Sequence, residues 1–348
     1  MARCFDSLCG QTLRDIEIIL VDDGSTDGSL KVCRDYQGRD ERVRVISKEN
    51  GGTTAARKTG FELARGEYVA FCDCDDYMPA TALQDLYDAA KQTRSDMVMG
   101  GIKRVLGKFT MSNITGKHQI TIEQPELFRR YYLSYFGMNL LPVNIWGRIY
   151  RKELLDDVAG GGEVLFHDDV RLLAGDEYFN LMLHPHLKSV TIINKPTYCY
   201  RWGGMSCRYD PHITELFTMG DLRVDLLDKY QYEVGYHYLF VEYKNVLHSW
   251  LVDFLQYKQG TLDDACRMAQ RELENRYLVS RMKDYYARRP QELRPELDDV
   301  VCRRADAIVG RAAQAARQGR KRLWMKKALF GLLSGYKTFA ESYLPHEQ

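Results

Sequence analysis

The sequence lacks several features that would restrict its function class. Its 348 residues contain no apolar run near 18 residues and no N-terminal signal-like segment, so neither a membrane span nor secretion is expected. The nine cysteines are an odd number with no CxxC pair or zinc-like spacing, which argues against a disulfide framework and a structural zinc site. We therefore expect a cytoplasmic protein, with peripheral attachment to the inner membrane face as an open alternative.

Two further absences narrow its partners. No glycine-rich loop with a basic residue lies near the first predicted strand, which disfavours an unrelated nucleotidyltransferase. The net charge is only +1, yet ten basic residues and one acidic residue lie between Arg303 and Lys337. Within this tail, the stretch from Arg317 to Leu333 mixes basic and apolar side chains, so either an anionic membrane surface or a solvated helix explains it. Nucleic-acid binding is not expected, because the aromatic residues here are not arranged as base-stacking platforms.

Strand-like and helix-like segments alternate along the first part of the chain. Apolar runs predict buried strands at residues 16–21 and 68–72, and helical spacing is found between them at residues 30–36 and 53–64. This alternation predicts an α/β fold with a mostly parallel sheet and helices on both faces. From Ile213 onward, apolar residues recur at helical spacing, which predicts a helical region.

Asp73 and Asp75 directly follow the predicted strand at residues 68–72, which we expect to be buried on both faces. If the backbone stays extended, both carboxylates point the same way from the carboxyl end of the strand, where α/β sheets hold ligands. Carboxylate oxygens suit Mg²⁺ or Mn²⁺, which also binds water and substrate phosphates. This predicts a site for a nucleotide diphosphate. The alternative is an acidic turn that caps the helix beginning near Pro79.

Three segments, in this order and spacing, resemble a known family. They are Gln11-Thr12 with residues 17–28 (EIILVDDGSTDG), residues 48–57 (KENGG and AAR) and residues 66–76 (GEY and DCDD). Together they resemble the nucleotide-binding half of the inverting family 2 glycosyltransferases, which have the GT-A fold. The resemblance implies a GT-A domain at residues 1–205, followed by a helical C-terminal region at residues 206–348 with a basic amphipathic tail.

The resemblance implies roles on the donor side. Asp22 and Asp23 would contact the uracil or ribose of a nucleotide sugar, with Asp23 favoured, unless they only shape a tight turn. Asp75 would bind the metal, and Asp73 the ribose or the metal. Arg57 lies near a helix start where a phosphate would be welcome, although it could be an ordinary surface arginine.

On the acceptor side, the resemblance places a general base at Asp176. The glutamate expected before it is replaced by Gly175, which leaves Glu177 as the alternative base. Inversion needs a carboxylate that takes the proton of the attacking hydroxyl, and it needs no Ser or Cys nucleophile. Arg201 could reach a donor phosphate from a lid, or could simply precede a glycine turn.

The predicted function is that of a metal-dependent inverting glycosyltransferase. It would move a sugar from a nucleotide diphosphate donor, in the first place a UDP-sugar, to a hydroxyl of a glycan or lipid-linked acceptor in cell-surface polysaccharide synthesis. Family domains open with one more strand, and this chain starts after it. We therefore expect a gap between the strands at residues 16–21 and 68–72, and weak or no activity unless upstream residues are restored. The alternative is a non-catalytic GT-A binding or scaffold protein, inactivated by loss of that strand.

Overall fold

The chain divides into two compact units. The computed structural model describes residues 1–106, 109–113, 119–136, 142–170, 174–201, 215–257 and 259–318. Among these residues, the first unit consists of residues 1–135 and 142–201, and the second of Phe136 and the helices between residues 215 and 318.

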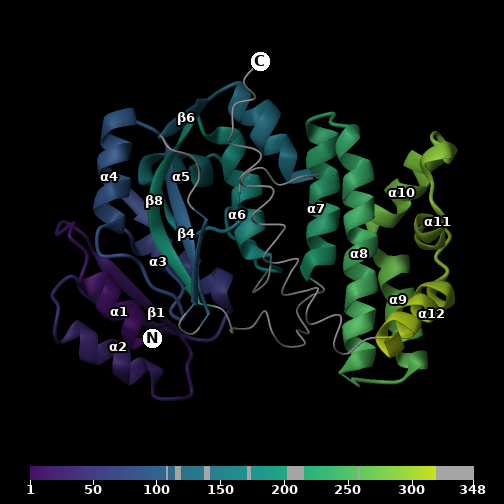
Figure 1. The fold of residues 1–348 in the computed structure, drawn as a ribbon, viewed down its shortest axis with the longest axis horizontal. Helices are drawn as coiled ribbons and strands as arrows, with labels where there is room; N and C mark the ends of the chain where they lie inside the picture. The colour runs from purple at the N-terminus through teal and green to yellow at the C-terminus, as the bar shows by residue number, and fades with distance from the viewer. Residues whose placement is uncertain are drawn as a thin grey trace. The chain divides into compact units, whose positions relative to one another are not determined.

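The first unit alternates strands with helices (Figure 1). Its strands are β1 (Ile18–Asp23), β2 (Val43–Lys48), β3 (Tyr68–Ala70), β4 (Met97–Leu106), β5 (Phe109–Asn113), β6 (Ile120–Glu123), β7 (Arg148–Arg151) and β8 (Ser189–Arg201). Its α-helices are α1 (Ala2–Cys9), α2 (Ser29–Gln37), α3 (Thr53–Leu63), α4 (Ala82–Thr93), α5 (Lys152–Gly160) and α6 (Gly175–Leu183). Short helical turns lie at Leu127–Tyr132, Leu133–Phe136 and His184–His186. The predicted strands and helices of this region are all present, with shifted ends.

The α/β class is confirmed, but the strand pairing is mixed rather than mostly parallel. Among the described strands, β1–β2 and β4–β8 pair in parallel, whereas β3–β7, β4–β7, β4–β5 and β6–β8 are antiparallel. Figure 1 shows β4 and β8 side by side. In the pairing order, β7 lies next to β4 and β6 next to β8. Apolar patterning predicts where a strand runs but says nothing about the direction of its neighbour, because side chains alternate alike in both arrangements.

The strands β1 and β3 belong to different sheets and do not pair with each other. The predicted gap, left by a further strand of the family, stays a prediction. The order of the larger sheet is β3-β7-β4-β8-β6, and β1 pairs only with β2 among the described strands. Helix α1 packs on the smaller sheet, where Cys4 and Phe5 are buried with Ile18 and Leu20. The same helix reaches the segment after β3, because the sulfur atoms of Cys4 and Cys72 lie 3.7 Å apart.

The strand β3 differs from its prediction in length and burial. It ends at Ala70, and Val69 is buried while Ala70 is exposed. It is therefore not buried on both faces. Successive side chains point to opposite faces, so one face of β3 is covered at Val69 and the other is open at Ala70. Among the described strands, β3 lies at the end of the larger sheet.

The second unit is helical, as predicted. Its helices are α7 (Glu215–Lys229), α8 (Val234–Gln256), α9 (Leu262–Asn275), α10 (Tyr277–Ala287), α11 (Pro295–Val301) and α12 (Ala305–Gln318), with a short turn at Pro290–Glu292. Figure 1 shows α7 and α8 side by side, and the Phe217 ring lies 5.4 Å from both Tyr243 and Trp250 between them. Their apolar rows are thus core, as their spacing indicated.

None of the helices that the structure describes is long and apolar enough to cross a bilayer. The stretch from Arg317 to Leu333, predicted to meet a membrane surface or to pack as a solvated helix, lies almost wholly outside the described residues.

Candidate active site

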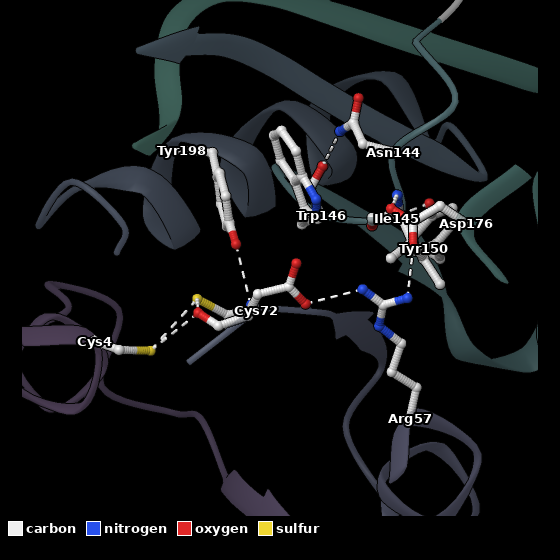
Figure 2. Close-up of polar contacts among 10 residues, drawn as sticks. Cys4, Arg57, Cys72, Asn144, Ile145, Trp146, Tyr150, Asp176 and Tyr198 are labelled. Carbon is white, nitrogen blue, oxygen red and sulfur yellow. Dashed lines mark hydrogen bonds and ion pairs between the residues drawn. The ribbon is translucent and has the colours of Figure 1, made fainter. Parts of the chain in front are cut away.

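Arg57 joins two carboxylates that are far apart in the sequence. Its Nη2 donates to Asp73 Oδ1 at 2.9 Å, and its Nη1 donates to Asp176 Oδ1 at 2.5 Å (Figure 2). Arg57 lies on α3, Asp73 follows β3, and Asp176 lies in the first turn of α6. The planar fork of a guanidinium can hold two carboxylates in fixed directions. The fold therefore brings the predicted donor residue and the predicted base to one cation.

The charge at this cation is fixed by its surroundings. Burial by itself would lower the pKa of Arg57, but the charges of Asp176 and Asp73, and hydrogen bonds to both, raise it above its ordinary value. The Arg57 side chain is 12% exposed, against 32% for Asp73 and 24% for Asp176. A ligand can therefore reach the open edges of the carboxylates more easily than the guanidinium. The predicted contact of Arg57 with a phosphate stays a prediction.

Asp176 is better placed than Glu177 to act at this point. Its Oδ1 is held by Arg57, and its Oδ2 accepts the backbone N–H of Ile145 at 3.1 Å. Both acidic residues lie in the first turn of α6, where the helix dipole favours negative charge. Neighbouring residues on a helix point about 100° apart, so Glu177 cannot share the direction of Asp176.

The acidic segment after β3 forms a turn and is not extended. The Asp76 N–H donates to Asp73 O at 3.0 Å, which closes a turn around Cys74 and Asp75. Spacing by two residues therefore does not place both carboxylates on one face, as it would on an extended strand. Asp73 is drawn to Arg57, whereas the Asp75 carboxylate is exposed and makes no hydrogen bond or ion pair with the described residues.

Residues at the end of β8 form hydrogen bonds with this turn. The Tyr198 hydroxyl accepts the Asp73 N–H at 3.0 Å, and Tyr77 pairs with Cys199 through two backbone hydrogen bonds. The Arg201 N–H donates to Asp76 Oδ1 at 2.7 Å, and its Nε donates to the carbonyl of Asp75. Burial raises the pKa of the Asp76 carboxyl to about 7. The predicted phosphate contact of Arg201 stays a prediction, since its side chain here supports the turn.

Comparison with known proteins identifies relatives of this chain. Residues 1–159 match the family model described as glycosyl transferase family 2. These residues resemble a family 2 glycosyltransferase domain, as the sequence predicted, and we call them the family 2 domain. The uncharacterized glycosyltransferase EpsJ of Bacillus subtilis is 36% identical over 200 residues, which cover 57% of this chain and 56% of EpsJ. The chain thus spans about half the length of that relative.

Solved structures of TarS from S. aureus resemble the whole fold. The complex of TarS 1-349 with UDP matches with a TM-score of 0.58 at 17% identity, covering 92% of this chain and 88% of that one. The complex with UDP-GlcNAc matches with a TM-score of 0.56 at 18% identity, covering 90% and 88%. At this identity the likeness shows a shared GT-A fold with C-terminal helices, as the sequence predicted.

In the family 2 domain, the Asp23 carboxylate already accepts hydrogen bonds from neighbouring residues. It accepts the Lys48 ammonium at 2.8 Å and the N–H groups of Gly51 and Gly52, the latter at 2.6 Å. Burial by itself would raise the pKa of Asp23, but these three donors have the larger effect together, and the pKa lies below its ordinary value. The carboxylate thus acts as a cap for α3, which begins after Gly52 and has no side-chain cap of its own. Asp22 is buried and accepts the Ser47 hydroxyl at 3.2 Å. The nucleotide contacts predicted for both residues stay predictions.

The carboxylates of the family 2 domain fit a hard cation in chemistry but not in number. Asp75 offers an exposed carboxylate, and Asp73 has one oxygen, Oδ2, beyond the one held by Arg57. No group of three or more ligating side chains occurs in the part of the chain that the structure describes. Mg²⁺ or Mn²⁺ would therefore need waters and phosphate oxygens to complete its shell, which is the usual arrangement for Mg²⁺ at a nucleotide.

Several groups that support the site could not be found from the sequence. The Tyr198 hydroxyl, the Ile145 N–H and the Asn180 amide each contact the site through the backbone, which leaves no motif in the sequence. Trp146, which follows Ile145, stacks on Tyr198 with ring centroids 4.3 Å apart. Part of its surface is thus taken up by packing.

Proposed function

We propose that this chain is an inverting glycosyltransferase that uses a nucleotide diphosphate sugar, in the first place a UDP-sugar. The observation that carries the proposal is the Arg57 guanidinium, which forms ion pairs with both Asp73 and Asp176. The two carboxylates therefore lie on either side of one side chain. Asp73 belongs to the acidic turn expected at the donor, and Asp176 is the carboxylate expected at the acceptor. A transferase needs these two functions side by side.

The reaction proceeds by one displacement. Asp176 takes the proton from the acceptor hydroxyl, the hydroxyl oxygen forms a bond to the anomeric carbon, and the bond from that carbon to the diphosphate oxygen breaks with its electron pair. Arg57 keeps the Asp176 carboxylate oriented. Its positive charge also favours the negative charge that develops on the leaving diphosphate. When bound at Asp73 and Asp75, Mg²⁺ or Mn²⁺ would offset the charge of the leaving diphosphate.

The donor class is supported by the fold neighbours, because TarS has been solved with UDP and with UDP-GlcNAc. For the acceptor we propose a hydroxyl of a glycan or lipid-linked saccharide in surface polysaccharide synthesis, which the resemblance to the family supports. The helical C-terminal region then lies outside the chemistry that we derive.

Calorimetry and a turnover assay test the proposal together. We expect UDP to bind in the presence of Mn²⁺ and to bind much more weakly with a chelator, and we expect at least weak UDP release from one or more UDP-sugars in a panel. Asp75→Asn should weaken the Mn²⁺-dependent binding, whereas Asp176→Asn should keep the binding and lose turnover by about 100-fold or more. Asp35→Asn, an exposed site paired with Lys31, is the matched control and should change neither.

Two outcomes would overturn the proposal. If UDP binds but no donor turns over, the alternative of a non-catalytic binding protein holds. If UDP does not bind with or without Mn²⁺, the donor assignment is wrong.

A further inference from the structure

A short segment at residues 142–146 presents one backbone N–H to the candidate base. The Ile145 N–H donates to Asp176 Oδ2 at 3.1 Å. The direction of this N–H depends on how the segment is held, because the segment has no regular secondary structure. Its carbonyl groups are held by buried side chains, which we consider in turn.

Asn180 holds this segment to the helix of the base. It lies one turn after Asp176 on α6 and is fully buried. Its Nδ2 donates to Val143 O at 2.6 Å and to Asp176 O at 2.7 Å. Because both neighbours are carbonyl oxygens, only the nitrogen of the amide can face them.

The contacts of Asn180 close a ring of hydrogen bonds around the base. From Asp176 O the ring runs through Asn180 Nδ2 to Val143 O, along the backbone to the Ile145 N–H, and back to Asp176 Oδ2. A closed ring fixes the distance between the carboxylate and the segment, so neither can turn without breaking a buried hydrogen bond. Figure 2 shows Ile145 beside Asp176, with Tyr150 next to them.

Tyr150 holds the same segment from the sheet. It is buried on β7, and its hydroxyl donates to Ile145 O at 3.2 Å. This bond acts on the peptide that follows the Ile145 N–H, and it reaches the segment independently of Asn180. The two side chains thus form a pair of supports, one from α6 and one from β7.

We propose that Asn180 is a positioning residue for the transfer reaction, which aims the Asp176 carboxylate through the segment at residues 142–146. This inference rests on the proposed function, since it takes Asp176 to be the base. Asn180 touches no reacting atom. It acts by keeping the Ile145 N–H on Oδ2 of the Asp176 carboxylate, while Arg57 holds Oδ1. Both oxygen atoms then keep fixed directions. Supports of this kind decide whether a base lies within reach of its proton.

The variant Asn180→Asp tests this role at nearly constant volume. It replaces the donating amide by a carboxyl group facing two carbonyl oxygens, so we expect the segment to move away. Turnover number should fall by about 10- to 100-fold, while the donor KM and the affinity for UDP with Mn²⁺ stay within about twofold, because Asn180 contacts none of the donor-side residues. Amide hydrogen exchange of the peptide containing residues 143–147 should become faster. Tyr150→Phe, which removes one hydrogen bond to Ile145 O, should do the same to a smaller extent, about three- to tenfold in turnover number.

The control is Thr191→Val, which removes a fully buried hydroxyl bonded to Ser95 and Thr121 elsewhere in the first unit. It should lower stability to a similar degree and leave turnover number unchanged. Faster exchange at residues 143–147 with unchanged turnover number would mean that Asn180 is only structural. Unchanged exchange and unchanged turnover number would also overturn the inference. If Asp176→Asn itself keeps full turnover, the proposed function fails, which is a separate result.

Discussion

The first unit carries two acidic pairs that look alike in the sequence and differ in the structure. Asp22 and Asp23 end β1, and Asp73 and Asp75 follow β3. The Asp23 carboxylate is saturated by donors of its own neighbourhood, whereas the Asp75 carboxylate is exposed and has no hydrogen-bond or ion-pair partner among the described residues. The comparison teaches that an acidic pair is available to a ligand only where the chain has not already supplied its hydrogen-bond donors.

The two pairs also differ in what holds them. Asp23 is bound mainly by backbone N–H groups at the start of α3, which every residue type except proline provides. Asp73 is bound by the Arg57 side chain from the same helix, and that side chain also binds Asp176. One helix therefore serves both pairs, as a capped N-terminus for the first and as the source of a cation for the second.

The largest expected effect comes from removing the cation. Arg57→Met leaves Asp73 and Asp176 close together with no positive charge between them, so we expect the free energy of unfolding to fall by about 3 kcal/mol. Urea denaturation followed by circular dichroism measures this. Arg39→Met, on the surface beside the Tyr36 ring, is the control and should cost less than about 0.5 kcal/mol. Equal losses in the two variants would show that Arg57 is not a central support.

The next effect separates the two acidic pairs directly. Asp23→Asn weakens the hydrogen bonds from Lys48, Gly51 and Gly52 and should lower the free energy of unfolding by about 2 kcal/mol. Asp75→Asn should change it by less than about 0.5 kcal/mol, since an exposed carboxylate loses little. Chemical denaturation of both variants under one buffer decides the matter. A larger loss for Asp75→Asn would reverse the comparison.

The pH dependence of stability gives a third prediction, which depends on a residue outside both acidic pairs, His184. Burial, and then the charge of Arg148, lower the pKa of His184 well below its ordinary value, and neither ring nitrogen has a hydrogen-bond partner among the described residues. Below about pH 6.5 the unfolded chain binds a proton at His184 that the folded chain does not, which lowers stability by up to about 1.4 kcal/mol per pH unit. Asp76, whose pKa is raised to about 7, gains its proton first in the folded chain and offsets part of this loss, so the His184 contribution is the difference between the native chain and His184→Phe.

Thermal unfolding between pH 7.5 and pH 5 measures this loss, and His184→Phe should remove its steepest part. The surface variant His186→Gln should keep it. Asp23 acts in a different pH range. Because its pKa is lowered in the folded chain, it stabilises the fold above about pH 4, and this stabilisation is lost only below that pH. A loss that begins only near pH 4 in the native chain would assign acid sensitivity to the carboxylates instead.

The smallest effect probes the turn after the first pair. Gly24 has a φ of +73°, and an added Cβ would lie 2.8 Å from the Asn50 nitrogen. Gly24→Ala should therefore lower the free energy of unfolding by about 1 kcal/mol. Gly28→Ala, four residues on, has nothing within 4 Å of its added Cβ and should be neutral or slightly stabilising. Differential scanning calorimetry of the two variants gives the difference, and equal midpoints would contradict the account of this turn.

The sequence by itself determined the order of strands and helices in the first unit, the family of residues 1–159 and the residue types at the site. These depend on local patterns: apolar spacing, turn residues and acidic pairs at the ends of strands. Asp73 was found from such a pattern, whereas Arg57 and Asp176 were found through the resemblance to the family; Arg57 lies 16 residues from Asp73 and 119 from Asp176 along the chain.

Only the tertiary structure decided which carboxylates are already satisfied and which are open. Asp23 meets donors from residues 48–52, and the acidic turn meets Tyr198 and Arg201 from β8, 125 residues away. It also decided the direction of the strands and the early end of β3. The physical reason is that a hydrogen bond depends on the position of its partner in space, and nothing in a local pattern records a partner that arrives from another part of the chain.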